Sequence, residues 1–336
     1  MKGIWLTAPQ TFSYQELPRP ELTPGSARVK VERVGICGSD LKIFSGENPF
    51  ARLPLIPGHE FAGTVSEVDY ESRFKVGDRV VAMPLLSCGT CEYCQKGEVN
   101  HCAELSVLGV HRHGAYADEV VLPERLLFPL PNDLPWGAAA LVEPVAVAVH
   151  NMRRGAVKTG DRVLVLGAGT IGLLIVSLAK LSGAAHVTVT DLFPSRLALA
   201  REFKADTTVN VKEVDIRDIA AAQGGFNVVF DVVGNRKTLD DATFATRPGG
   251  RIVLVGVPHE PYEAVNVKNI FAHELVFTAS RLYDTQDFAQ AVTLMGEKRI
   301  PAEKLLSLTL PLAGLAEGLE RLKSDPEHVI KVLLQP

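Results

Sequence analysis

Between about residue 146 and residue 280, short apolar runs alternate with segments long enough to form helices. A run of consecutive apolar positions is typical of a strand buried on both faces, and helix-length segments between such strands favour parallel pairing. The pattern therefore predicts a doubly wound parallel sheet of six strands. The six runs span residues 163–167, 187–191, 207–211, 227–233, 251–257 and 275–279.

Residues 1 to about 130 have a different sequence pattern, in which short predicted strands are separated by proline and glycine. Apolar and polar positions alternate from Ala27 to Val34, and a shorter apolar strand follows at Arg79–Ala82. This spacing predicts a compact, largely antiparallel β domain.

The chain ends in a mixture of helix and strand patterns, and the apolar run Val329–Leu334 can return to the first domain. We therefore predict that residues 1–145 and 281–336 form one mostly β domain. Residues 146–280 would form an α/β domain inserted into it.

A glycine motif follows the first of the six apolar runs. Gly167 permits a tight turn, Gly169 lets the backbone approach a pyrophosphate, and Gly172 lets the following helix pack closely on the strand. Ile171 lies inside the motif and is predicted to contact the cofactor. A strand before the glycines and a helix after them favour a dinucleotide site over a chance cluster.

An acidic residue at the end of the second run indicates which dinucleotide binds. Asp191 stands 19 residues after Gly172, where a carboxylate accepts hydrogen bonds from the adenosine ribose and repels a 2′-phosphate. We therefore expect NAD rather than NADP. Arg196 either is a helix-surface arginine or lies over the adenine and reduces the preference for NAD over NADP.

Composition limits the partners and the location. The chain has 336 residues, 46% hydrophobic and 22% charged, with a formal net charge of -4 at pH 7. It is long enough for two domains and has no basic field for nucleic acid or anionic lipid. The start lacks the apolar core of a signal peptide, and glycines within residues 163–181 argue against a membrane span there. We expect a cytoplasmic protein.

Four cysteines are closely spaced as C-x2-C-x2-C-x7-C, at Cys88, Cys91, Cys94 and Cys102. Four thiolates at this spacing can surround a tetrahedral Zn²⁺ at about 2.3 Å per sulfur. Because all four ligands come from the protein, such an ion would be structural. Two disulfides or an iron–sulfur cluster are the alternatives, but a chain without a signal peptide disfavours disulfides, and ferredoxin cysteine spacings differ.

The fifth cysteine belongs to a second set of possible ligands. Cys37 precedes His59 and Glu60 by 22 and 23 residues, and Glu143 places a carboxylate inside a later apolar run. A buried carboxylate needs a cation or a proton, and a mixed thiolate, imidazole and carboxylate set suits a catalytic Zn²⁺ with one open position. Alternatively, His59 and Glu60 only make local hydrogen bonds in a glycine-framed turn.

Together these motifs resemble those of the zinc-dependent medium-chain dehydrogenase/reductase family, along essentially the whole chain. That family has a GroES-like, mostly β catalytic domain and a Rossmann nucleotide domain. The matching segments are Gly35–Asp40, Gly58–Glu60, Cys88–Cys102, Glu143–Pro144 and Gly167–Gly172.

Two departures narrow the resemblance. Glu143 stands where classical alcohol dehydrogenases carry cysteine, which is similar to the polyol branch of sorbitol, threonine and sugar-acid dehydrogenases. Val107–His111, Ser280–Leu282 and the Lys331–Leu334 ending resemble bacterial sugar-acid 5-dehydrogenases acting on galactonate or gulonate.

The resemblance implies a mechanism. Zinc at Cys37, His59 and Glu60, with Glu143 either a further ligand or the holder of the metal's water, would lower the pKa of a substrate hydroxyl so that hydride passes to the nicotinamide. Ser39 matches the position that begins the family's proton relay, although it is also a plausible turn residue. Lys42 replaces a histidine found there in many polyol enzymes, so water through Glu143 is the alternative proton exit.

The same resemblance implies a substrate and an assembly. Lys42, His111 and Arg281 are the candidate substrate contacts, and the guanidinium of Arg281 can bind the carboxylate of a polyhydroxylated acid. Arg281 can equally pair with Asp284, Asp287 or the cofactor. We also expect a homodimer or homotetramer, with Arg251–Gly256 and Phe271–Phe277 contributing to the sheet-edge interface.

Several alternatives remain open. A neutral polyol such as sorbitol, a sugar phosphate or threonine would also suit the family. A zinc-free quinone reductase or a non-catalytic cofactor-binding relative would share the fold and the glycines, but would not need Cys37, His59 and Glu143.

Overall fold

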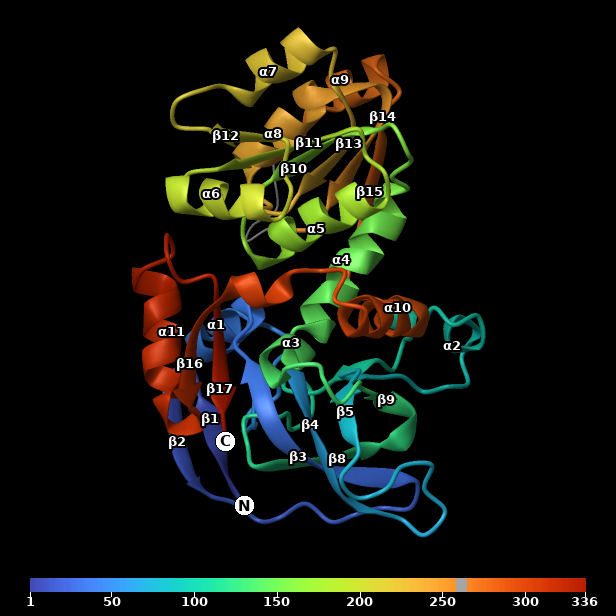
Figure 1. The fold of residues 1–336 in the computed structure, drawn as a ribbon, viewed down its shortest axis with the longest axis vertical. Helices are drawn as coiled ribbons and strands as arrows, with labels where there is room; N and C mark the ends of the chain where they lie inside the picture. Colours follow the sequence, from blue (N-terminus) through green and yellow to red (C-terminus); the bar gives the residue numbers. More distant parts are fainter. Residues whose placement is uncertain (258–264) are drawn as a thin grey trace. The chain divides into compact units, whose positions relative to one another are not determined.

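The computed structural model describes residues 1–257 and 265–336 (Figure 1). The chain divides into two compact units. The first unit consists of Met1–Ala146 and Asp284–Pro336, and the second unit consists of Val147–Tyr283. The helix α4 (Val142–Gly155) carries the chain from the first unit into the second.

The first unit is built on a seven-stranded sheet. Its strands run in the order β16-β17-β3-β4-β5-β9, with β8 also pairing with β3, and all pairs are antiparallel except β16 with β17. The last strand of the chain therefore lies beside β3. The strands are β3 (Ser26–Gly35), β4 (Glu60–Val68), β5 (Arg79–Ala82), β8 (Glu119–Pro123), β9 (Leu127–Pro129), β16 (Leu306–Pro311) and β17 (Lys331–Gln335).

Two small two-stranded sheets and several helices complete the first unit. These sheets pair β1 (Lys2–Ala8) with β2 (Thr11–Glu16) and β6 (Leu85–Leu86) with β7 (Ser106–Val107). The helices are α1 (Gly38–Ser45), α2 (Glu92–Gln95), α3 (Trp136–Ala140), α10 (Thr285–Gly296) and α11 (Leu315–Ser324), with 3-10 turns at Val99–His101, Glu124–Leu126, Ala302–Leu305 and Leu312–Gly314.

Strand β3 is more deeply buried than its alternating sequence predicts. Arg28 should face solvent, yet it is 4% exposed. Its Nε donates to Glu67 at 2.8 Å and its Nη1 donates to the carbonyl of Pro20 at 2.8 Å. Because these partners satisfy the guanidinium, the side chain can be covered at little cost.

The second unit is a six-stranded parallel sheet in the order β12-β11-β10-β13-β14-β15. Helices α5 and α6 lie on one side of the strands, and α7, α8 and α9 lie on the other (Figure 1). The strands are β10 (Arg162–Leu166), β11 (His186–Asp191), β12 (Thr207–Asn210), β13 (Phe226–Asp231), β14 (Thr246–Leu254) and β15 (Val276–Ala279); the helices are α5 (Thr170–Leu181), α6 (Pro194–Glu202), α7 (Ile216–Gln223), α8 (Arg236–Ala245) and α9 (Val267–Ala272).

This sheet confirms the predicted doubly wound fold and its strand order is that of a Rossmann domain. The apolar runs supply the core: Leu164, Phe226, Val229 and Ile252 lie in one buried cluster. Parallel strands covered by helices on both faces bury consecutive residues, which is why these runs lack alternation.

The fifth strand differs from the prediction. β14 begins at Thr246, five residues before the predicted start at residue 251. Thr246 pairs with Phe226, and the register then shifts before Arg251 pairs with Val228. The residues between them include Pro248 and two glycines. Proline and glycine are uncommon inside strands, so the sequence did not indicate that the strand begins at Thr246.

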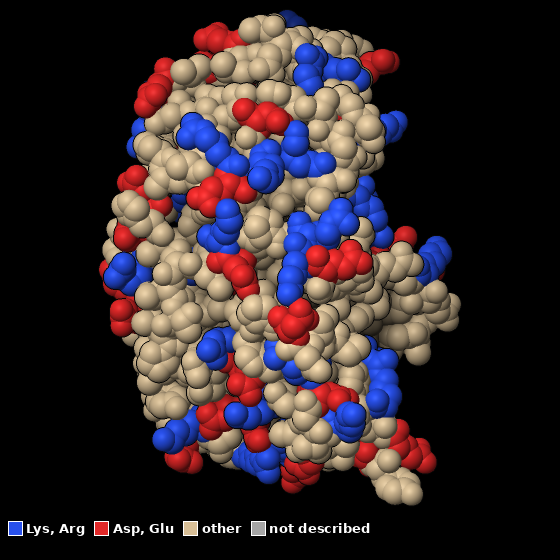
Figure 2. All heavy atoms as spheres, in the orientation of Figure 1, with Lys and Arg blue, Asp and Glu red and all other residues tan. Residues whose placement is uncertain are grey.

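The surface drawn in Figure 2 carries basic and acidic side chains interspersed with one another. Within the described residues, no helix combines the length and the apolar character needed to cross a membrane.

Candidate metal and cofactor sites

The pairing of β3 with β4 assembles three of the predicted ligands. Gly35 at the end of β3 pairs with Glu60 at the start of β4, so Cys37 comes close to His59 and Glu60. Ligand atoms of these three residues all lie within 4.8 Å of one another. A Cβ at position 35 would meet Oε2 of Glu60 at 2.2 Å, so glycine is needed there. We call Cys37, His59 and Glu60 the metal group.

Glu60 is also held by a lysine from the end of the chain. Nζ of Lys331 lies 3.0 and 2.8 Å from the two carboxylate oxygens of Glu60 and donates to the carbonyl of Ile36 at 3.1 Å. Both side chains are buried. Burial lowers the pKa of Lys331, but the Glu60 and Cys37 charges outweigh it and raise that pKa above its ordinary value.

His59 faces different groups through its two ring nitrogens. Nε2 lies 3.5 Å from Oγ of Ser39, and Nδ1 lies 3.7 Å from Oδ1 of Asp40. Asp40 is fully buried; its Oδ2 accepts hydrogen bonds from the backbone N–H of Cys37 at 2.9 Å and from the hydroxyl of Tyr116 at 2.7 Å. Burial raises the pKa of Asp40, while His59 and these two donors oppose the rise.

The surroundings of His59 are anionic. Burial lowers the pKa of His59, but the charges of Asp40, Cys37 and Glu143 outweigh it and hold that pKa well above its ordinary value. Nδ1 of His59 and Oδ1 of Asp40 are buried without a hydrogen-bond partner. Surroundings that favour positive charge and offer a cysteine sulfur, an imidazole and a carboxylate as ligands fit a zinc ion.

Glu143 lies close to this group without belonging to it. Its side chain is buried in the first turn of α4, and its charge raises the pKa values of His59 and Lys331. Among the described residues, the compact set of possible ligands holds Glu60 and not Glu143.

The candidate relay residues both lie on α1. Ser39 is next to the imidazole of His59, as described above. Lys42 follows one turn later with a half-buried side chain, and its carbonyl accepts hydrogen bonds from the backbone N–H groups of Glu47 and Asn48 at 2.9 and 3.0 Å.

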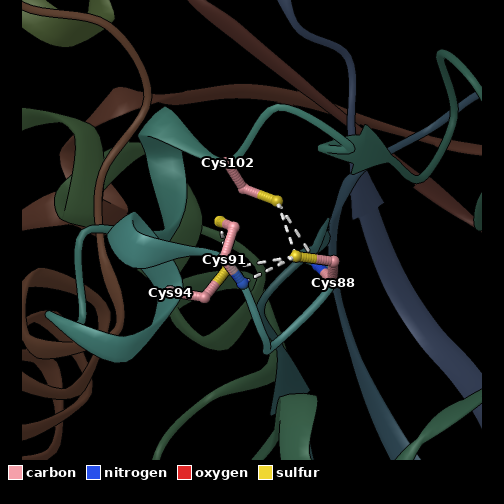
Figure 3. Close-up of side chains that lie close together, drawn as sticks. All are labelled: Cys88, Cys91, Cys94 and Cys102. Atoms are coloured by element: carbon pink, nitrogen blue, oxygen red, sulfur yellow. Dashed lines mark hydrogen bonds between the residues drawn. The ribbon is translucent and has the colours of Figure 1, made fainter.

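The four remaining cysteines form a second, more exposed cluster, which we call the cysteine lobe (Figure 3). Cys88 lies 3.8 Å from Cys94 and 3.6 Å from Cys102, and Cys91 lies 3.5 Å from Cys94, all between sulfur atoms. Ligands about 2.3 Å from a tetrahedral zinc would be separated by about 3.8 Å. The cysteines are free thiols, so this spacing fits four zinc ligands rather than two disulfides.

Within the lobe, hydrogen bonds from the backbone stabilise the thiolate of Cys88. The pKa of Cys88 is lowered to about 6, because the backbone N–H groups of Thr90 and Cys91 and the hydroxyl of Thr90 donate to its sulfur. A thiolate is the form that binds zinc.

The glycine motif shapes the N-terminus of α5 in the second unit. Gly167 adopts φ +105°. A Cβ on Gly172 would lie 1.9 Å from the carbonyl oxygen of Gly167. Gly169 precedes α5 and faces open space, because a Cβ built there meets no heavy atom within 4 Å. Ile171, in the first turn of α5, is half-buried. This open helix start suits a pyrophosphate.

Asp191 is already engaged by the backbone. Its Oδ2 accepts from the N–H of Ala168 at 2.8 Å, and its Oδ1 accepts from those of Leu192 and Phe193 at 2.7 and 3.1 Å. Nη1 of Arg196 lies 3.8 Å from Oδ2. The carboxylate is therefore fixed at the end of β11, beside the glycine turn.

The two substrate candidates lie in different units. His111 belongs to the first unit, where its Nδ1 accepts from the N–H of Val107 at 3.0 Å. Arg281 belongs to the second unit and is exposed.

Three residues of the metal site had not been assigned a role from the sequence: Asp40, Tyr116 and Lys331. A lysine inside the apolar run Val329–Leu334 was a usable signal, since a buried charge requires a partner. Tyr116 offered no such signal, because a tyrosine among apolar residues is ordinary core.

The chain matches two protein families. Residues 23–132 match the alcohol dehydrogenase GroES-like domain, and residues 170–297 match the zinc-binding dehydrogenase family.

Curated relatives match over almost the whole chain. The starvation-sensing protein RspB of Escherichia coli K12 is 34% identical, covering 99% of both chains. Sorbitol dehydrogenase of Bacillus subtilis is 30% identical, covering 100% of this chain and 97% of its own. L-galactonate-5-dehydrogenase of E. coli K12 is 32% identical, covering 95% and 94%.

Solved structures of similar proteins also match the whole chain. An alcohol dehydrogenase (rspB) from E. coli CFT073, complexed with NADH, has a TM-score of 0.94 at 33% identity, covering 100% of this chain and 99% of its own. A zinc-binding dehydrogenase from Sinorhizobium meliloti 1021, bound to NADP, has a TM-score of 0.93 at 31% identity with the same coverage. The chain belongs to the zinc-dependent medium-chain dehydrogenase family. Within it, the chain is a polyol or alcohol dehydrogenase that uses zinc and NAD(P) and acts on CH–OH groups.

Proposed function

We propose that this chain transfers hydride between NAD and a secondary alcohol of a polyol or sugar acid at a zinc ion held by Cys37, His59 and a carboxylate. The observation that carries the proposal is the metal group itself, a thiolate, an imidazole and a carboxylate within 4.8 Å in anionic surroundings. Bound there, zinc would supply the positive charge that makes a substrate hydroxyl more acidic.

Two carboxylates compete for the third ligand position. Glu60 is in the metal group, but Lys331 contacts both of its oxygens. Glu143 is buried close by and contributes negative charge. We propose that Glu60 balances the charge of the site from its pairing with Lys331 and that Glu143 completes the ligand set or orients a water there.

Ser39 has the position required of a proton acceptor beside the metal group. Its hydroxyl lies 3.5 Å from Nε2 of His59 on the first turn of α1, and can both accept a proton from a substrate hydroxyl and donate its own onward. Lys42 lies one turn further along the same helix. We propose that Ser39 receives the substrate proton, and that the outer path runs past Lys42 or through water at Glu143.

For the cofactor, we propose NAD, with Gly167, Gly169, Ile171 and Gly172 around the pyrophosphate and Asp191 on the adenosine ribose. The open N-terminus of α5 and the fixed carboxylate of Asp191 support this choice. Arg196 lies 3.8 Å from that carboxylate, so NADP would meet one cation there as well as the anion.

For the substrate, we propose a sugar acid of the galactonate or gulonate kind. In the first unit, the backbone N–H of Arg52 donates to Val110 at 2.9 Å, and that of Ile56 donates to Nδ1 of His113 at 3.2 Å. These contacts bring the loop before His59 against the loop that carries His111, Arg112 and His113. The exposed guanidinium groups of Arg52 and Arg112, on two adjoining loops, favour an anionic substrate, which includes a sugar phosphate.

We also propose that the cysteine lobe holds a structural zinc, and that the protein associates through the edge of the second unit's sheet. The strand β15 is one of the two edges of this sheet. Val276 and Phe277 of β15 are exposed, and so is Phe271 of the preceding helix α9, at 85%. Exposed apolar side chains at a sheet edge suit a second copy of the chain.

The test is turnover by the purified protein with NAD and with NADP over an aldonate, its alditol and a sugar phosphate. We expect the best kcat/KM with NAD and the aldonate, with Arg281→Met reducing only the rates of anionic substrates. If the alditol is the best substrate, or if Arg281→Met slows all three equally, the sugar-acid assignment fails and a general polyol dehydrogenase is left. A native protein without zinc would overturn the proposal altogether.

A further inference from the structure

We propose that the hydroxyl of Tyr116 is a positioning group of the metal group: it fixes the carboxylate of Asp40, which orients His59 toward the ion. This inference rests on the proposed function, because it needs an ion at Cys37 and His59. The hydroxyl would act through Asp40 and not on the ion itself.

The two oxygens of Asp40 serve different partners. Oδ2 accepts from the backbone N–H of Cys37 at 2.9 Å and from the Tyr116 hydroxyl at 2.7 Å. Oδ1 lies 3.7 Å from Nδ1 of His59, and both atoms are buried without a hydrogen-bond partner. Two donors on one oxygen hold the carboxylate in place and leave the other oxygen facing the imidazole.

This arrangement selects which nitrogen of His59 is offered to an ion. Nδ1 faces the carboxylate, so in the neutral ring it carries the proton. Nε2 is then the donor atom, and it lies on the side of Ser39. A carboxylate that holds the far nitrogen of a metal-binding histidine fixes the orientation of the ring and makes it a better ligand. Any group that holds the carboxylate therefore contributes to metal affinity.

Tyr116 has the properties of a permanent donor. Its side chain is fully buried, and burial raises its pKa well above the ordinary value, so the hydroxyl keeps its proton. The carbonyl of Gly35, at 3.3 Å, is a more distant acceptor for that one proton. A donor of this kind costs free energy to bury unless its bond is made, which favours the short bond to Asp40.

The ring of Tyr116 has a separate packing role. A Cβ on Gly58, the residue before His59, would meet the ring at 2.5 Å, so the ring and the turn at Gly58 are in close contact. Phenylalanine would keep this contact and remove only the hydroxyl. The substitution Tyr116→Phe therefore separates the hydrogen bond from the packing.

The experiment measures metal affinity, not turnover, in the full chain. Native protein, Tyr116→Phe, Asp40→Asn and the double variant are loaded with zinc or cobalt and titrated with a chelator. Cobalt distinguishes the sites, because one thiolate binds in the metal group and four in the cysteine lobe. We expect Tyr116→Phe to weaken the metal group about tenfold, at the lower end of the range for groups that support a ligand. The cysteine lobe should be unchanged in every variant.

The control is Ser26→Ala, which removes another buried hydroxyl of the first unit. Oγ of Ser26 donates to the carbonyl of Thr23 at 2.5 Å, and we expect its loss to leave both metal affinities unchanged. In the Asp40→Asn background, Tyr116→Phe should change the affinity of the metal group less than about twofold. The carboxylate through which the Tyr116 hydroxyl acts on His59 is already absent there.

Two results would overturn the inference. One is native affinity in Tyr116→Phe with only a stability loss like that of Ser26→Ala. The other is a tenfold loss that persists beside Asp40→Asn, which would mean that the hydroxyl acts by a route that does not pass through Asp40. The metal content of the native protein is read first: an ion in the lobe alone defeats the proposed function, whereas two ions with an unaffected Tyr116→Phe defeat only this inference.

Discussion

The metal group and the cysteine lobe belong to the same unit of the chain but are built in opposite ways. The lobe takes four identical ligands from Cys88–Cys102, and three of these cysteines are half-buried. The metal group brings together three different residues at the paired ends of β3 and β4, and its neighbours include Lys331, which is 271 residues from Glu60 in the sequence.

Their surroundings differ accordingly. In the lobe, backbone N–H groups of the same short segment stabilise the sulfur of Cys88. Around the metal group, the buried carboxylates of Asp40 and Glu60 outnumber the single buried ammonium of Lys331. A closed local site of this kind serves stability, whereas a buried site with mixed ligands and an open position can do chemistry. Substitutions in the two places should therefore have separable effects.

The largest effect is expected at Cys37. Cys37→Ser should lower kcat by about 10³-fold, because the charge stabilisation that a catalytic metal provides is worth several kcal/mol. The variant should still fold, bind NAD and keep the metal of the lobe. Turnover and metal content of the same preparation measure both. Loss of both metals would mean that the two groups are not independent.

The second-largest effect is expected on stability, from breaking the buried ion pair between Lys331 and Glu60. Lys331→Met should cost about 3 to 5 kcal/mol in the free energy of unfolding, because it leaves the charge of Glu60 buried without a partner. Adding Glu60→Gln should restore much of that loss. Urea unfolding measures both free-energy changes. The control is Lys298→Met, because the ion pair of Lys298 with Asp133, at 2.7 Å, is exposed and contributes little to stability. Equal losses in both lysine variants would contradict the role given to burial.

Cys91→Ser should affect stability instead of chemistry. We expect a loss of about 3 kcal/mol and lower solubility, because loss of a metal is among the mechanisms of large destabilisation. The rate per folded molecule that retains the ion of the metal group should stay near native. Thermal unfolding together with active-site titration measures this. A rate that fell with the lobe's metal would make the lobe part of the chemistry.

The smallest effect lies outside both groups. Asp191→Ala should raise the KM for NAD about tenfold, as expected for loss of one charged hydrogen bond, and should narrow the gap with NADP. Both metals should remain. Steady-state kinetics with the two cofactors measure it; a native preference for NADP would refute the role of Asp191 and point to Arg196.

The fold was predictable where the pattern is local. The apolar runs predict the central strands β10, β11 and β13 of the second unit because helices on both faces bury nearly all of their residues. The start of β14 was missed, because Thr246 becomes part of a strand only through its pairing with Phe226. Likewise, the alternation in β3 does not reveal that Arg28 is buried and bound to Glu67 and Pro20.

The sequence alone determined the cysteine lobe and the glycine turn. Ligand spacing within 15 residues, or glycine at a tight turn such as Gly167 with φ +105°, constrains the backbone whatever the rest of the chain does. Neighbours in the sequence cannot avoid being neighbours in space, so spacing is sufficient.

Only the tertiary structure decided the surroundings of the metal group. Tyr116 reaches Asp40 across 76 residues, and Lys331 reaches Glu60 across 271, because β17 and the loop before β8 pack beside β3 and β4. Burial gives these contacts their strength: a charge or hydroxyl removed from water must find a partner within hydrogen-bonding distance. Which partner that is depends on which strands are neighbours, and no local pattern in this chain specifies it.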